Sequence, residues 1–273
     1  MSESAEREFK RLVEVVAELR GPEGCPWDRK QTYRSLRPFV LEEAYEVLEA
    51  IDRDDVESLG EEIGDLVFEG VLLAQLAAEA GDFTISDSLR SITDKLIRRH
   101  PHVFGTSSKA GSAEEVLGLW EAAKARERAG EAGEKTILGG VPASLPALLA
   151  AHEMSTRAAA VGFDWERATD VLAKIQEEVD ELRTEVEAVA AGSGNLRAVE
   201  EEMGDLLFAI ANLSRKLGVE PEAALRQANA KFRRRFTEME RRIVSRGGRL
   251  QDMALEALEA EWEHAKEGLS NED

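Results

Sequence analysis

Residues 41–68 read LEEAYEVLEAIDRDDVESLGEEIGDLVF and contain two short acidic motifs, EEAYE at 42–46 and EEIGD at 61–65. Apolar residues recur every three or four positions around both motifs, which predicts two amphipathic helices. Within each motif the acidic residues stand one helical turn apart, so their carboxylates project side by side. Glu43 and Glu46 border the apolar stripe of the first helix, and Glu62 borders that of the second. A purely solvated acidic face would instead lie opposite the core.

The same arrangement occurs a second time, with EEVDE at 177–181 and EEMGD at 201–205. In both halves a Lys-x-x-x-Arg pair and then a Trp-x-x-x-Lys pair follow the acidic motifs in the same order. This order predicts a duplicated helical unit, with domains at residues 1–128 and 146–273. Residues 129–145 are rich in Gly, Ala, Ser and Pro and are expected to form the linker.

No stretch shows the alternation of apolar and polar residues that is typical of β-strands, so the predicted fold class is all-α. Helices are expected over 6–20, around both acidic motifs of each half, over about 85–99, from near Ala113, and over about 146–161. Pro38 is expected near the N-terminal end of its helix, where proline is tolerated.

The composition limits the classes of partner. The 273-residue chain carries a net charge of −20, which argues against a general nucleic-acid surface or an anionic membrane surface. Its one cysteine excludes an intramolecular disulfide, and the N-terminal residues lack the pattern of a signal peptide. No apolar run approaches the roughly 20 residues that span a bilayer. We therefore expect a soluble cytoplasmic protein.

Clustered carboxylates repel one another unless a cation lies between them, and oxygen ligands favour Mg²⁺ or Mn²⁺ over Zn²⁺ or Cu²⁺. A solvated helix face explains any single pair equally well, but it explains poorly why the pairs recur in both halves. A di-iron carboxylate bundle requires two Glu-x-x-His motifs, and this chain has one, Glu261 to His264, with Ala122 at the matching position of the first half.

The repeated basic and aromatic residues allow two interpretations. Lys95, Arg99, Lys231 and Arg235 fit either the basic end of a helix or a phosphate contact. Trp120 and Trp262 suit either a core position or stacking on a base. No glycine-rich phosphate loop is present, so a bound nucleotide would be held through metal ions and side chains.

These acidic motifs, with CPWD at 25–28 and HPHVF at 100–104, resemble the MazG family of nucleoside triphosphate pyrophosphohydrolases in its tandem two-domain form. The resemblance implies all-α domains whose four-helix bundle is completed by dimerisation, so a homodimer is expected. It also implies Mg²⁺-dependent hydrolysis of nucleoside triphosphates to monophosphate and pyrophosphate. The metal ligands that it implies are Glu43, Glu46, Glu62, Asp65, Glu178, Glu181, Glu202 and Asp205. The substrate contacts that it implies are Lys95, Arg99, Trp120, Lys124, Lys231, Arg235, Trp262 and Lys266.

Glu61 and Glu201, next to the ligands, are candidate bases for the attacking water. We expect broad base specificity and a house-cleaning role in the nucleotide pool. Two alternatives remain open: a narrow-specificity dUTP or dCTP pyrophosphatase, and a non-catalytic acidic helical dimer that binds a regulatory partner.

Overall fold

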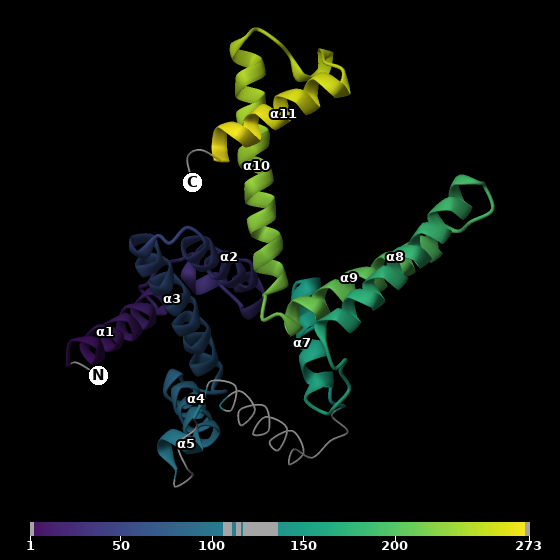
Figure 1. Ribbon diagram of the computed structural model, residues 1–273. Coiled ribbons are helices and arrows are strands. Elements are labelled where there is room, and N and C mark those ends of the chain that lie inside the picture. The colour runs from purple at the N-terminus through teal and green to yellow at the C-terminus, as the bar shows by residue number, and fades with distance from the viewer. Residues whose placement is uncertain (1–2, 106–110, 113–115, 117–135, 271–273) are drawn as a thin grey trace. The chain divides into compact units, whose positions relative to one another are not determined.

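The computed structural model describes the chain except for residues 1–2, 106–110, 113–115, 117–135 and 271–273. The described part contains helices and no strands, which confirms the all-α class (Figure 1). The chain divides into two compact units, Met1–Lys124 and Ala125–Asp273. The expected helix from near Ala113 and the linker residues 129–135 fall largely or wholly outside the described residues.

The first unit is built around a helical hairpin. Its elements are α1 (Glu3–Arg20), a short 3₁₀ helix (Asp28–Lys30), α2 (Tyr33–Asp52), α3 (Val56–Ala80), α4 (Ile85–Arg99) and α5 (Pro101–Phe104). The helices α2 and α3 pack along each other, and α1 and α4 both pack against α3. The central helix α3 therefore carries the contacts that hold the unit together.

The core of the first unit joins three helices. Val16 of α1, Leu36 of α2, and Val71 and Leu72 of α3 are buried together. Burying apolar surface is the main favourable contribution to folding, so these contacts hold the three helices together. The hairpin is thus fixed by its apolar face, and its acidic residues lie beside that face.

Local signals set the ends of these helices. The Thr32 side chain accepts a hydrogen bond from the Ser35 N–H, and the Ser35 hydroxyl accepts one from the Thr32 N–H, so the pair forms a capping box. This cap starts α2 at Tyr33, and Pro38 therefore lies inside the helix instead of near its N-terminal end. Between α2 and α3, Asp54 adopts φ 55°, a left-handed conformation that Asp tolerates better than most residues.

The second unit contains α7 (Ala147–Ala159), α8 (Ala168–Ala190), α9 (Leu196–Lys216), α10 (Pro221–Ser245), a 3₁₀ helix (Leu250–Asp252) and α11 (Leu255–Ser270). The helices α8 and α9 form the counterpart of the α2–α3 hairpin, and α7 packs on α9 (Figure 1). The helices α10 and α11 pack together through buried Met239, Ile243 and Ala265. Among the described residues, no helix is long and apolar enough to cross a membrane.

Candidate metal centres

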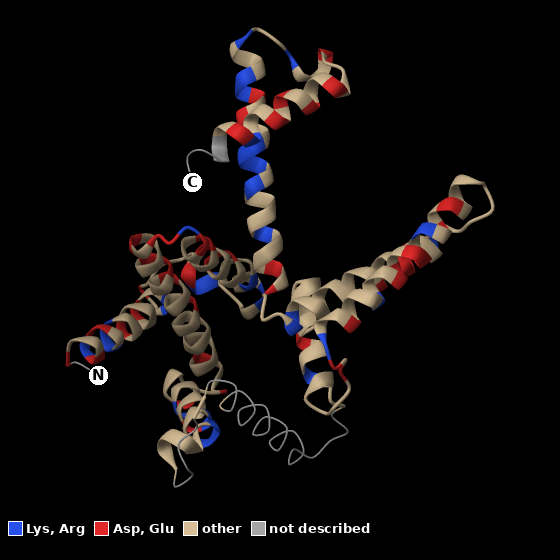
Figure 2. Ribbon diagram, viewed as in Figure 1, with Lys and Arg blue, Asp and Glu red and all other residues tan. Residues whose placement is uncertain are grey.

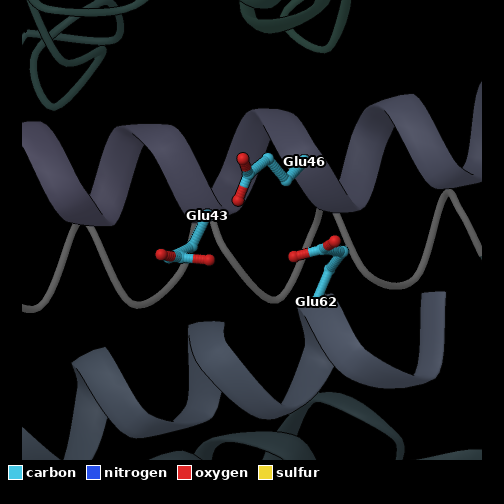
Figure 3. Close-up of side chains that lie close together, drawn as sticks. All are labelled: Glu43, Glu46 and Glu62. Atoms are coloured by element: carbon cyan, nitrogen blue, oxygen red, sulfur yellow. The ribbon is translucent and has the colours of Figure 1, made fainter. Parts of the chain in front are cut away.

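The α2–α3 hairpin brings three of the predicted ligands together. Glu43 and Glu46 project from α2 and Glu62 projects from α3, and each offers a carboxylate oxygen within 4.8 Å of the others (Figure 3). Two of these residues stand one turn apart on one helix, and the third faces them across the helix–helix contact. The helical register that the sequence predicts is therefore sufficient to bring them together.

The carboxylates of this cluster repel one another. Burial raises the pKa of Glu43, and the neighbouring carboxylates of Glu46, Asp65, Glu62 and Glu69 raise it further. Burial likewise raises the pKa of Glu62, with added repulsion from nearby acidic groups. Both shifts have the same physical cause, because burial and neighbouring negative charges disfavour the ionised form of a carboxyl group.

Asp65 and Glu69 extend the cluster along α3. Asp65 is exposed and lies outside the three-residue group, although its charge acts on Glu43 and Glu62. Glu69 is 6% exposed, and burial followed by the charge of Asp65 raises its pKa. The first half therefore carries a buried carboxylate, one turn beyond Asp65 on α3, that is not among the four ligands that the family resemblance implies.

The α8–α9 hairpin forms a second cluster of the same kind. Glu178 and Glu181 of α8 and Glu202 of α9 offer oxygens within 4.8 Å of one another. Burial raises the pKa of Glu202, and the neighbouring carboxylates, Glu181 first, raise it further. Asp205 is exposed and also acts on Glu202 through its charge. Three of the four predicted ligands in each half are thus within reach of one ion, with the fourth one turn further along.

Lys174 is a residue that the sequence reasoning missed. Its Nζ donates to the Glu177 carboxylate at 2.7 Å and lies 2.7 Å from that of Glu178, and hydrogen bonds to these two residues raise the pKa of the lysine. The spacing of four residues between Lys174 and Glu178 is a signal that could have revealed the pair. The matching position in the first half is Phe39, so only the second cluster has a lysine at this position.

The two candidate bases lie on the exposed side of the clusters. Glu61 and Glu201 are exposed and belong to neither three-residue group. The Glu201 carboxylate pairs with Arg197 at 3.2 Å on the surface of α9. Their assignment as bases stays a prediction.

The predicted substrate contacts lie on other helices. Lys95 and Arg99 lie toward the end of α4, Lys231 and Arg235 lie on α10, and Trp262 and Lys266 lie on α11. Basic residues follow one another along α10, whereas acidic residues gather along α8 (Figure 2). Trp120 and Lys124 lie outside the described residues. The contact of these basic residues with a substrate held at the carboxylates stays a prediction.

Trp262 has a structural role whatever its part in binding. It packs against the buried cluster between α10 and α11, and its ring lies 5.2 Å from that of Phe232. Trp262 is half-buried, so one part of its ring packs in the core and the stacking role stays a prediction.

The Glu-x-x-His spacing that a di-iron centre would need is used differently. The Glu261 carboxylate lies 2.6 Å from Arg246 and 3.6 Å from Arg242. His264 is exposed and belongs to neither group of potential metal ligands. This part of α11 is therefore an ion-paired helix surface.

The donor chemistry of the two clusters suits a hard divalent cation. All the converging atoms are carboxylate oxygens, which are ligands of Mg²⁺ and Mn²⁺. Beside the first group, Oε2 of Glu69 is buried without a hydrogen-bond partner among the described residues. The residues present therefore fit a metal ion of that class.

Comparisons with known proteins show which family the chain belongs to. The profile of the MazG nucleotide pyrophosphohydrolase domain matches residues 31–104 and 167–239, which include both hairpins. The chain is 46% identical over 260 residues to the nucleoside triphosphate pyrophosphohydrolase of Escherichia coli K12, covering 95% of this chain and 97% of that protein. It is 44% identical, over 95% and 96% of the two chains, to the "Nucleoside triphosphate pyrophosphohydrolase/pyrophosphatase MazG" of Thermotoga maritima. A solved mazG-related protein from Thermotoga maritima matches 42% of this chain and 98% of its own at 30% identity, with a TM-score of 0.37. Two domain matches and relatives of this length and identity show that the chain is a tandem-domain member of the MazG family of nucleotide pyrophosphohydrolases.

Proposed function

We propose that this MazG-family enzyme hydrolyses nucleoside triphosphates to the monophosphate and pyrophosphate in a reaction that depends on Mg²⁺ and accepts Mn²⁺. The observation that supports this most directly is the pair of carboxylate clusters, each built from two adjacent helices with oxygens within 4.8 Å. The names of the relatives point to the same substrate class.

In each half the four acidic residues would hold the ion. Glu43, Glu46, Glu62 and Asp65 are the proposed ligands in the first half, and Glu178, Glu181, Glu202 and Asp205 are those in the second. A bound Mg²⁺ would neutralise phosphate charge and lower the pKa of a bound water. Without it, a polyanionic triphosphate would be repelled by these same carboxylates.

The remaining residues would act on the substrate and on the water. Glu61 and Glu201 are the proposed bases that accept a proton from the water attacking the α-phosphorus. Lys231, Arg235 and Lys266 would stabilise the departing pyrophosphate, because fixed cations favour the charge that develops on a leaving group. Lys95, Arg99 and Lys124 are their counterparts in the first half.

Lys174 adds a cation directly beside the second cluster. Its ammonium group contacts Glu178, which is 5% exposed. An ammonium held at the edge of a carboxylate cluster is available to a phosphate oxygen once a metal ion binds the carboxylates instead. The second half therefore combines acidic ligands and a basic group in one place.

The reaction is tested by incubating the protein with each of the canonical and several damaged triphosphates in Mg²⁺ and separating the products. We expect monophosphate and pyrophosphate from many bases, and loss of turnover in EDTA that added Mg²⁺ or Mn²⁺ restores. Such breadth would support a house-cleaning role in the nucleotide pool. A steep preference for dUTP or dCTP would instead support the narrow-specificity alternative. Release of diphosphate and orthophosphate would contradict the proposal.

Exposed apolar residues on the second hairpin support the proposed homodimer. Met203, Leu207 and Ile210 recur about one turn apart on α9 and are 43%, 45% and 42% exposed. A contiguous apolar stripe of this kind is typical of a surface that another helix covers. We propose that the matching hairpin of a second copy covers it and completes a four-helix bundle.

Sedimentation of the wild-type protein is expected to show a dimer. Leu207→Glu places a charge in the proposed interface and is expected to weaken dimerisation by on the order of 100-fold, because burying an unpaired charge is costly. Leu255→Glu is the matched control, since Leu255 is 66% exposed at the start of α11. A wild-type monomer of full activity would contradict the dimer.

A further inference from the structure

The buried Glu69 distinguishes the first cluster from the second. It lies on α3 four residues after Asp65 and seven after Glu62, so all three side chains leave the helix on nearly the same side. The charge of Glu69 contributes to the raised pKa of Glu43 on the facing helix. Glu69 lies outside the three carboxylates that converge within 4.8 Å and extends the acidic face of α3 one turn beyond Asp65.

The Glu69 side chain has an unmet need for a positive partner. Its residue is 6% exposed, and its Oε2 atom is buried with no hydrogen-bond partner in the described structure. Burying a carboxylate without compensation is expensive, and buried charges are therefore normally paired or bound to a metal ion. The charged neighbour that raises its pKa is itself a carboxylate, Asp65.

The second half has one carboxylate fewer and a lysine beside its cluster. Ala209 stands at the position that matches Glu69 and is 8% exposed, so no fifth carboxylate is present there. Lys174 supplies a positive charge within 2.7 Å of buried Glu178. In the first half the position of this lysine is occupied by Phe39, which packs against the hydrophobic core.

We propose that Glu69 is a fifth carboxylate ligand in the first half, and that this site holds a divalent cation more tightly than the second site does when no nucleotide is bound. The inference rests on the metal dependence proposed above and assigns to the first half a resident ion. Five carboxylates without a built-in cation favour retention of the ion. Four carboxylates with Lys174 favour an ion that arrives with the substrate.

Mn²⁺ binding to the full-length protein without nucleotide tests the proposal, with free Mn²⁺ measured by electron paramagnetic resonance. The wild type is expected to show two classes of site whose dissociation constants differ by about tenfold or more, the factor seen for supporting groups at metal sites. Glu69→Gln is expected to weaken the tight class by about tenfold or more and to leave the other class unchanged. Glu57→Gln, an equal charge change at an exposed position of the same helix, is expected to change neither class.

A variant in the second half tests the difference in Mn²⁺ affinity between the two sites. Lys174→Met removes the competing ammonium and is expected to tighten the weaker class toward the tight one. The proposal is overturned if Glu69→Gln binds Mn²⁺ as the wild type does, or if the tight class responds to Lys174→Met instead. If Glu69→Gln does not fold, the response to Lys174→Met decides alone. Because nucleotide is absent, these outcomes are independent of whether the protein releases pyrophosphate.

Discussion

In the full-length protein, replacing Glu178 and Glu181 together by Gln is expected to lower Mg²⁺-dependent pyrophosphate release by on the order of 100-fold. The two residues are neighbours on α8 and contribute two of the three converging oxygens of the second cluster. Gln keeps the size of each side chain but removes its negative charge, so the change tests ion binding with little effect on packing. Lys174 contacts both Glu178 and Glu177, so the substitution removes the charge of one of its two carboxylate partners.

The matched substitution in the first half, Glu43→Gln with Glu46→Gln, is expected to lower turnover by a much smaller factor. The first cluster carries the additional carboxylate of Glu69 and has Phe39 in place of Lys174. Both differences make the first site more negative, and a triphosphate is therefore repelled more strongly there. On this reasoning the second half carries most of the turnover.

Initial rates of pyrophosphate release at saturating Mg²⁺ measure both effects, and circular dichroism confirms that each variant remains helical. A larger loss from the first-half pair than from the second-half pair would show that the first half carries most of the turnover and would contradict this prediction. Retention of wild-type rates by both pairs would remove the carboxylates from the reaction.

Helical periodicity explains why so much of the site is predictable from the sequence. Glu43 and Glu46 stand one turn apart beside an apolar stripe, and the stripe can be buried only by turning the acidic edge toward the neighbouring helix. A short turn around Asp54 forces α2 and α3 to lie along each other, which brings Glu62 opposite the pair. Three of the four predicted ligands in each half meet for this reason.

The burial of Glu69 and the contacts of Lys174 cannot be read from the sequence, because they depend on how the helices pack. Glu69 reads as one more acidic residue of α3, and its burial becomes visible only when the helices are packed. Lys174 reads as a solvent-facing lysine until its distances to Glu177 and Glu178 are known. Pro38 lies further inside α2 than the sequence predicts, because the Thr32 cap starts the helix at Tyr33.

The contacts of the basic residues are also beyond what helical periodicity predicts. The structure places Lys231 and Arg235 on α10 and Lys266 on α11. Their approach to the carboxylates depends on contacts between helices distant in sequence or between two copies of the chain. Local spacing carries no information on such contacts, so their predicted role rests on the duplicated order of the motifs and on the family resemblance.

Leu72→Ala is expected to lower the free energy of unfolding of the first unit by about 2 to 5 kcal/mol, the range for truncating a buried leucine. Leu72 is 1% exposed and packs in the cluster that joins α1, α2 and α3. The loss combines the transfer free energy of the missing methyl groups with the cavity left behind. Since α3 also carries Glu62, the same loss loosens the helix that supplies one side of the first metal site.

Urea unfolding followed by circular dichroism measures this effect, with Val56→Ala as the control. Val56 is 80% exposed at the start of α3, so its truncation removes little buried surface and is expected to change stability by less than about 0.5 kcal/mol. A cost below about 1 kcal/mol for Leu72→Ala would mean that α3 is not the central packing element of the unit. The expected cost is large because Leu72 lies where three helices meet, and no single neighbour can move to fill the space without disturbing the other two.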